Sequence, residues 1–228
     1  MPRRAQASPE HDALRPSPQV RKCLLSDNMR ILSVGGTGTL GTAVGETLRA
    51  RGHELLTVGR KSGDFQADMT DPTEVGRVFD EAGPLDAVVS AAGSVPYKRL
   101  TEMTPEDYLS AYRGKVAGQI ELVRQGTSRI AARGSFTLIT GVLSREPIVT
   151  GSAAALANGA VESFVLAAAL EIAPQRINAV SPTVFTESLD QYGDFFPGYP
   201  PVPLAEAAQA YVRSVEGGET GKIFRLPV

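Results

Sequence analysis

The residues whose spacing is most typical of ligand binding are three glycines near the start of the chain, Gly35, Gly38 and Gly41. They follow an apolar run at 31–34 and precede a helical pattern of apolar residues at 43–50. Between a strand and a helix, such glycines allow a tight turn, close approach of the backbone to a pyrophosphate, and close packing of helix on sheet. The segment predicts a dinucleotide-binding loop, the alternative being a βα turn without a ligand. The expected contacts are Gly35, Thr37, Gly38, Thr39, Leu40 and Gly41.

A polar loop follows the next apolar run, 54–58, and contains Arg60, Lys61 and Ser62. It begins about 25 residues after the glycines, where the ribose of a dinucleotide is expected, and Gly59 stands where an NAD site places an acid. Arg60 can pair bidentately with a 2′-phosphate, and Lys61 and Ser62 can add donors. The loop predicts a preference for NADP (NADPH) over NAD, the alternative being a solvated basic loop.

The elements that must position these loops alternate between strand and helix patterns. Besides the first strand and helix, the sequence predicts strands over 54–58, 65–69, 85–90, 135–140, 176–181 and 223–226. It predicts helices over 72–82, 105–125, 153–173 and 204–215, with Thr104 as the cap of the second of these. Strands that alternate with crossover helices predict an α/β fold, a Rossmann-like doubly wound parallel sheet of about seven strands with helices on both faces. We expect one domain over 29–228.

The composition excludes several other classes of protein. A net charge of -2 over 228 residues argues against a nucleic-acid surface. The long small-apolar stretch at 151–173 is interrupted by polar and charged residues, so we expect no membrane span. The single cysteine, Cys23, fits a reducing compartment, and His11 and His53 are not placed for a Ser-His hydrolase. We therefore expect a cytoplasmic protein. We also expect no metal site, because no further hard ligands converge near the acidic residues around position 68.

Residues 1–28 differ from the rest of the chain, because prolines lie among Arg, Ser, Gln and Glu without periodicity. We expect a disordered extension, or an upstream start that leaves Met29 as the natural first residue. A targeting peptide is the alternative, since the segment is basic. Against it, Glu10 and Asp12 interrupt the basic residues and there is no apolar region for secretion.

Three ordered motifs give the chain a resemblance to the short-chain dehydrogenase/reductase family, from Met29 to the C-terminus. They are the glycine loop at 35–41, Ser90-Ala91-Ala92-Gly93 in place of the family's Asn-Asn-Ala-Gly, and Asn178-Ala-Val-Ser-Pro182. The glycine spacing is similar to that of the extended and atypical branches, whereas the length is that of a compact member. The resemblance implies a nicotinamide dinucleotide at the carboxyl ends of the strands. It also implies that Asp68 contacts the adenine. The further cofactor contacts that it implies are Ser90, Ala91, Ala92, Gly93, Lys115, Pro182 and Val184.

Asp68 also has a second interpretation, as a surface carboxylate in an acidic turn with Asp64 and Asp71.

The family's catalytic groups are missing from the positions that the resemblance implies. Members use a Tyr-x-x-x-Lys pair and a serine, in which the tyrosine donates the proton, the lysine lowers its pKa and binds the ribose, and the serine orients the carbonyl. Here Ala154 stands at the tyrosine, Asn158 at the lysine, and Gly141, with Thr140 beside it, at the serine. Because a positioned acid contributes about 10²–10⁴ in rate, the family's standard mechanism cannot operate here.

A substitute catalyst is implied by Lys115, which falls on the family's active-site asparagine. Lysine and asparagine then exchange helices, and the Lys115 ammonium faces the nicotinamide ribose or a substrate oxygen. The alternative is a register one turn away, with Lys115 on a solvated face. Thr140 and Asn158 complete the candidate catalytic set. Candidate proton donors are Tyr97 and two tyrosines of the loop that covers the substrate, Tyr192 and Tyr199.

Two functions remain open at this point. The first is an NADP-dependent oxidoreductase with a rearranged active site that acts on a small carbonyl or alcohol. The second is an inactive NADP(H)-binding sensor or scaffold protein. The helices expected at 105–125 and 153–173 carry more apolar and small residues than one sheet face can bury, and related proteins pair through them, so we expect a homodimer or homotetramer.

Overall fold

The computed structural model of the chain describes residues 28–227, which form one parallel sheet of seven strands. The strand order is β3-β2-β1-β4-β5-β6-β7. Their bounds are β1 Arg30–Val34, β2 Glu54–Gly59, β3 Phe65–Gln66, β4 Leu85–Ser90, β5 Ile130–Ile139, β6 Arg176–Ser181 and β7 Lys222–Arg225. The order confirms the predicted doubly wound sheet, and the chain reverses direction across the sheet between β1 and β4, where such folds bind their ligands.

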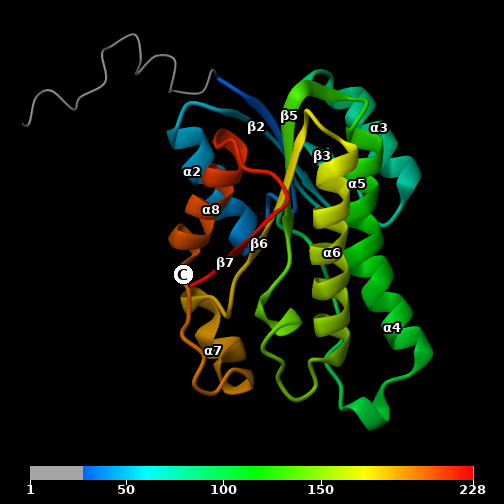
Figure 1. Cartoon of the computed structure of the whole chain (residues 1–228), viewed down its shortest axis with the longest axis vertical. Coiled ribbons are helices and arrows are strands. Elements are labelled where there is room, and N and C mark those ends of the chain that lie inside the picture. The colour runs from blue at the N-terminus through cyan, green and yellow to red at the C-terminus, as the bar shows by residue number, and fades with distance from the viewer. Residues whose placement is uncertain (1–27, 228) are drawn as a thin grey trace, which may run out of the picture.

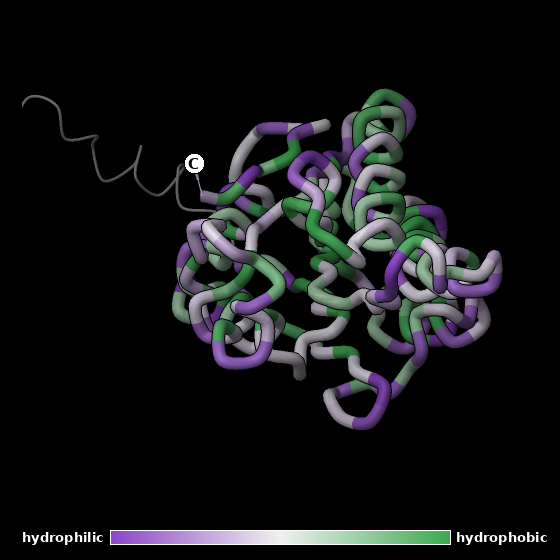
Figure 2. Tube along the Cα trace, turned by 90° about the horizontal axis from the view of Figure 1, so that it is seen from below, coloured by the Kyte–Doolittle hydropathy of each residue, from purple (hydrophilic) through white to green (hydrophobic). Residues whose placement is uncertain are grey.

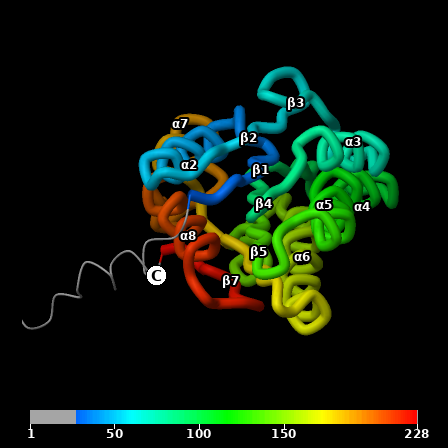
Figure 3. Tube along the Cα trace, turned by 90° about the horizontal axis from the view of Figure 1, so that it is seen from above, coloured from blue at the N-terminus to red at the C-terminus, as the bar shows by residue number. Residues whose placement is uncertain are grey.

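Helices cover both faces of this sheet (Figure 1). Their bounds are α2 Thr39–Ala50, α3 Pro72–Ala82, α4 Pro105–Ala111, α5 Gly118–Gly126, α6 Ser152–Glu171, α7 Leu189–Tyr192 and α8 Leu204–Glu216. Seen from above, α2 and α8 lie on one side of the strands, and α3, α4, α5 and α6 lie on the other (Figure 3). Each layer closes its own apolar core, one around Phe136 and Leu138 and the other around Val44 and Tyr211. The hydrophilic parts of the trace lie mainly at its periphery (Figure 2).

Two helix starts follow directly from the sequence. Asp71 caps α3 by accepting a hydrogen bond from the Thr73 amide at 2.8 Å, and Pro72 occupies the first turn. Thr104 caps α4 in a reciprocal capping box with Asp107, as its position before Pro105 predicted. These caps fix where the chain leaves the loops that follow β3 and β4.

The helix that α4 begins is not a regular α-helix along its length. A π-helical segment, Tyr112–Ala117, joins α4 to α5, so the helix predicted over 105–125 is continuous but wider in its middle. Such π segments are rare and often occur at functional sites. Lys115 lies within this segment.

The remaining element boundaries differ modestly from those expected. β3 is confined to two residues instead of five, while β5 begins at Ile130, earlier than predicted, with a shift of register against β4. The loop at 187–203 contains the short helix α7. Residues 1–27, which include Cys23 and His11, lie outside the described residues, and so does the expectation of a disordered extension.

Helix α6 satisfies the length and composition of a membrane span, despite the polar interruptions noted in its sequence. Its core-facing residues Val161 and Val165 have no exposed surface, because they pack in the same apolar cluster as Phe136 and Ile177. A buried helix of a sheet-based core passes the same test, so this feature is weak evidence for a membrane.

Candidate functional site

A cavity of about 320 Å³ lies at the carboxyl ends of β1, β2 and β4, where the strand order reverses. This is the place where open α/β sheets bind nucleotides. The glycine loop, the end of β2 and the segment after β4 all reach it. Among the residues expected at the cofactor, those that line it are Gly35, Thr37, Gly38, Arg60, Asp68, Ala91, Ala92 and Gly93.

The glycine loop leaves no room for a side chain at several of its positions, and Gly35 and Gly41 are two of them. Gly35 has a φ of 76°, and a Cβ there would come within 2.8 Å of the Ala92 Cβ. A Cβ on Gly41 would overlap the Gly35 carbonyl oxygen. The loop therefore keeps its backbone bare at the cavity, as close approach to a pyrophosphate requires.

Helix α2 begins at Thr39, immediately after this loop. Its N-cap, Gly38, offers no side-chain hydrogen bond, and no acidic residue lies in the first turn. The first amide groups of a helix have no intrahelical partner, and its dipole favours an anion at this end. Thr39 is exposed beside the loop, whereas Leu40 is buried and packs in the core, so its side chain does not face a ligand.

The end of β2 carries no acid, and the structure gives a steric reason. A Cβ on Gly59 would lie 2.6 Å from the Thr37 hydroxyl and 2.6 Å from the Ser62 carbonyl oxygen. Arg60 is exposed and lines the cavity. Lys61 and Ser62, which were expected to add donors, are exposed and are not among the lining residues. The positive charge at this end of the cavity therefore comes from Arg60.

The surroundings of Asp68 can be compared with those of its acidic neighbours, Asp64 and Asp71. Asp64 accepts hydrogen bonds from the Thr57 amide and hydroxyl at 2.8 and 2.7 Å, and Asp71 caps α3. Asp68 also has a structural partner, because its Oδ1 accepts from the Thr70 amide at 2.9 Å, but of the three carboxylates it alone is partly buried and lines the cavity. This placement agrees with the adenine contact that the resemblance implies.

The segment after β4 connects this cavity to a second one. The Ser90 carbonyl oxygen accepts a hydrogen bond from the buried Tyr211 hydroxyl at 2.7 Å, which fixes the start of the segment. The Ser90 side chain is buried and has no partner among the described residues. At Gly93, a Cβ would lie 2.9 Å from the Lys115 Cγ, so the lysine stem runs directly over the segment.

The second cavity has a volume of about 160 Å³ and contains the whole candidate catalytic set. Lys115, Thr140, Asn158 and Tyr97 all line it, together with Ala154 and Gly141. The residues at the family's tyrosine, lysine, serine and asparagine positions thus meet around one space. The walls are mainly apolar, from Val95, Val142, Leu143, Phe185 and Phe196.

Lys115 is partly buried and points into the site, so the alternative of a solvated face is wrong. Its Nζ donates a hydrogen bond to the Thr140 carbonyl oxygen at 3.2 Å. Burial lowers the pKa of the Lys115 ammonium to about 8, and the negative charge of Glu162 opposes this shift. A pKa near the working pH suits a group that gives up a proton during a reaction.

Asn158 lies on α6 facing the same space. Its Nδ2 donates to the Gly141 carbonyl oxygen at 3.2 Å, while its buried Oδ1 has no partner among the described residues. An acceptor left unpaired in a buried site costs about 1–3 kcal/mol unless a ligand or water donates to it. A hydroxyl group of a bound ligand is a suitable donor.

Thr140 lines this cavity, but its hydroxyl is already engaged. The hydroxyl donates to Glu162 Oε1 at 3.1 Å, and the Thr140 backbone carbonyl accepts from Lys115. Tyr97 is half-exposed and lines the cavity, and desolvation by its surroundings raises the pKa of its phenol.

The loop at 187–203, here called the covering loop, packs against this cavity. Phe196 and Tyr199 pack edge to face with ring centroids 5.6 Å apart, and the Tyr199 hydroxyl donates to the Glu146 carbonyl oxygen at 3.1 Å. Both rings contact the apolar cluster of Val142, Leu143 and Ala154. Tyr192 is exposed. After β6, Pro182 lines the cavity, whereas Val184 is buried beside it and does not line it.

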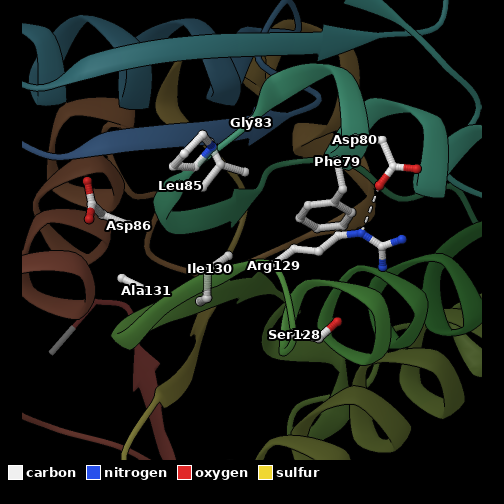
Figure 4. A pocket seen from close by; sticks show the side chains of 10 residues that line it. Phe79, Asp80, Gly83, Leu85, Asp86, Ser128, Arg129, Ile130 and Ala131 are labelled. Carbon is white, nitrogen blue, oxygen red and sulfur yellow. Dashed lines mark hydrogen bonds and ion pairs between the residues drawn. The ribbon is translucent and has the colours of Figure 1, made fainter.

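A cavity of about 500 Å³ at the opposite end of the sheet is not a comparable site (Figure 4). It lies at the amino ends of β4 and β5, where Leu85 and Ile130 begin those strands. Its charged residues are already paired, because Arg129 Nε donates to Asp80 Oδ1 at 3.1 Å and Asp86 accepts from the Arg30 amide. Ligands of parallel sheets bind at the carboxyl ends instead.

Sequence reasoning missed one polar residue of this second cavity. Thr183 follows Pro182, is buried, and its hydroxyl has no partner among the described residues. The only available signal was its position directly after the strand at 176–181. It adds a second unpaired polar atom to the space between Lys115 and the covering loop.

Comparison with known proteins identifies relatives of this chain by sequence and by fold. A family model described as enoyl-(acyl carrier protein) reductase matches residues 32–199. The solved structure of the protein lin1944 from Listeria innocua is 44% identical, with a TM-score of 0.85, over 87% of this chain and 99% of that one. Versicolorin reductase of Emericella nidulans is 27% identical over 69% of this chain and 71% of its own length. A small-chain dehydrogenase solved in complex with NADPH shares the fold, with a TM-score of 0.78, 23% identity, and coverage of 88% and 97%.

Proposed function

This chain belongs to the short-chain dehydrogenase/reductase family of oxidoreductases, and we propose that it is an NADP-dependent member that acts on a small carbonyl or alcohol through a rearranged active site. The observation that carries this proposal is the meeting of Lys115 and Asn158 in one cavity beside the dinucleotide loop. When bound, the nicotinamide supplies or accepts the hydride.

The residues present fit such a cofactor. The bare glycine loop and the uncapped start of α2 suit the pyrophosphate, Arg60 suits a 2′-phosphate, and the unpaired Asn158 Oδ1 suits a ribose hydroxyl. Family relatives solved with NADPH support the choice of dinucleotide at the level of the fold.

In the proposed mechanism, Lys115 takes over the work of the missing tyrosine. Its ammonium polarises the substrate oxygen and gives it a proton during reduction, and the Thr140 carbonyl holds it in place. Asn158 orients the ribose, and Tyr97 stands at the cavity mouth as a second proton source. The apolar walls exclude water and favour a substrate that is mostly apolar around its carbonyl.

NADPH should bind about 10- to 100-fold more tightly than NADH, because a bidentate, charge-assisted pair with Arg60 contributes roughly 1.5–3 kcal/mol. Fluorescence titration with both dinucleotides measures the ratio. The Arg60→Ala variant should lose most of this preference, while Lys61→Ala, whose side chain does not line the cavity, should keep it. Equal dissociation constants in the wild type, or an unchanged preference in Arg60→Ala, would contradict the assignment.

An inactive NADP(H)-binding sensor or scaffold is the second candidate. It is favoured by Ala154 and Gly141, which leave the family's two hydroxyl positions without a hydroxyl. The two candidates differ in one test. A protein that binds NADPH but reduces none of a broad panel of aldehydes and ketones is a sensor or scaffold, and measurable turnover excludes that role.

The proposed active form is a homodimer or homotetramer built through α4, α5 and α6. Leu156, Leu166 and Leu170 on α6 are 48%, 56% and 84% exposed, and Leu109 and Tyr112 are exposed on the neighbouring helix. Large apolar side chains gathered on adjacent helices indicate a protein interface. Sedimentation should give a dimer or tetramer at micromolar concentration for the wild type and for Leu100→Glu, whose leucine is exposed on the turn at 100–102 outside these helices. Leu166→Glu/Leu170→Glu should sediment as a smaller species, and a monomeric wild type would refute the interface.

A further inference from the structure

Glu162 lies one helical turn beyond Asn158 on α6 and is used by no step of the proposed reaction. A single carboxylate oxygen, Oε1, accepts hydrogen bonds from three hydroxyl groups: Thr140 at 3.1 Å, Ser144 at 2.8 Å and Ser181 at 3.0 Å. These residues come from the end of β5, the turn at 142–144 and the end of β6. Glu162 therefore ties together the three segments that form the floor of the second cavity.

The two charged groups linked to Glu162 through hydrogen bonds are cations. Arg145 donates to the Ser181 hydroxyl at 2.8 Å, and that hydroxyl in turn donates to Glu162. On the other side, the Thr140 hydroxyl contacts Glu162 while the Thr140 carbonyl accepts from Lys115. The other charged groups near this set are Glu146 and Arg225, and both act on Arg145. Glu162 thus lies between two cations, and each is linked to it through one intervening residue.

We propose that Glu162 is the positioning residue of the Lys115 site: its carboxylate fixes the strand end whose Thr140 carbonyl binds the lysine, and it supplies the negative charge of that site. The proposal rests on the proposed function, because it assigns Glu162 a role toward the catalytic lysine. Two effects support it. The hydroxyl bonds hold Thr140 so that its carbonyl meets the ammonium, and the negative charge opposes the loss of the Lys115 proton that burial favours. A neutral acceptor in place of Glu162 can supply only the first effect.

Glu162→Gln separates these two effects, because glutamine retains an oxygen that accepts the hydroxyl bonds but carries no charge. The pH at which half of the Lys115 ammonium groups have lost their proton, here called the Lys115 midpoint, can be measured by NMR of protein labelled with [ε-¹³C]lysine, without cofactor or substrate. The other lysines are Lys22, Lys61, Lys98 and Lys222, and Lys115→Arg identifies the signal by its loss. The wild-type midpoint should lie near 8. In Glu162→Gln it should fall by about one unit, the scale of a charge interaction across several ångströms of protein.

Two further variants control for structural effects. Ser144→Ala removes one of the three hydroxyl bonds but no charge, so its Lys115 midpoint should equal that of the wild type. Glu162→Asp withdraws the carboxylate by one methylene and should give an intermediate midpoint. If Glu162→Gln does not fold, as judged by circular dichroism, Glu162→Asp decides the matter alone.

An unchanged Lys115 midpoint in the folded Gln or Asp variant overturns the proposal. So does an equal fall in Ser144→Ala, because the effect would then come from loss of structure. Titration of the wild type with NADPH distinguishes failure of the proposed function from failure of the role assigned to Glu162. Failure to bind NADPH overturns the proposed function, whereas normal binding with an unmoved Lys115 midpoint overturns only the role of Glu162.

Discussion

Replacing Lys115 by methionine should lower NADPH-dependent carbonyl reduction by about 10²–10⁴-fold, the usual contribution of a positioned acid. Methionine keeps most of the length of the stem that packs over Gly93, so the fold should remain intact. The loss should exceed that of any single hydroxyl in the cavity, because Ala154 and Gly141 leave no hydroxyl at the family's tyrosine and serine positions. Steady-state kinetics with NADPH and an aldehyde or ketone substrate measures the change.

Lys98→Met is the matched control, since Lys98 forms an exposed ion pair with Asp107 and is not among the residues that line the second cavity. Its activity should be unchanged. The wild-type rate of reduction should also fall as pH rises through about 8, because the Lys115 pKa lies there and the deprotonated amine has no proton to give. Wild-type turnover in Lys115→Met would reduce this lysine to a structural role.

Gly41→Ala should abolish measurable NADPH binding and destabilise the protein. The added methyl group overlaps the Gly35 carbonyl oxygen, which is backbone and cannot rotate away. Relief requires the loop and the start of α2 to separate, and overpacking of this kind costs about 1–3 kcal/mol. The displaced amides then no longer converge on the pyrophosphate, and each lost charge-assisted bond weakens binding by roughly 10- to 100-fold. Fluorescence titration and thermal unfolding measure the two effects.

Gly218→Ala is the control for this variant, because a Cβ at that position meets nothing within 4 Å. It should bind NADPH like the wild type and unfold at a similar temperature. If Gly41→Ala behaved in the same way, the glycine loop could not be a tight phosphate cradle, and the site would have to lie elsewhere.

The parts of the fold that could be predicted were those whose residues are buried on both faces. The strands at 85–90 and 176–181 have the predicted bounds, since strands covered by helices on both faces are continuous apolar runs. The first half of β5 was missed because Ala131, Ala132 and Arg133 are exposed and show neither an apolar run nor alternation. The third strand was predicted too long because it lies at the sheet edge and pairs over only two residues.

The cofactor loop could be predicted because its residues are consecutive and their spacing reflects local geometry. The catalytic cavity could be predicted only in part. A π-helical segment changes the direction of Lys115 by an amount that no α-helical periodicity can give, so the choice between cavity and solvent stayed open. The Glu162 network joins Thr140, Ser144 and Ser181 only through tertiary packing. Lys61, Ser62 and Val184, which were also predicted to contact the cofactor, are not among the residues that line the two cavities.

A crystal structure of the wild-type protein with NADP⁺ bound tests the central claim most directly. We predict the 2′-phosphate beside Arg60, the pyrophosphate at the 35–41 loop, and both Lys115 Nζ and Asn158 Oδ1 within hydrogen-bond reach of the nicotinamide ribose or of the space beside nicotinamide C4. A nicotinamide that lies away from the second cavity, with Lys115 still bonded only to the Thr140 carbonyl and Asn158 Oδ1 still unpaired, would contradict the proposed active site.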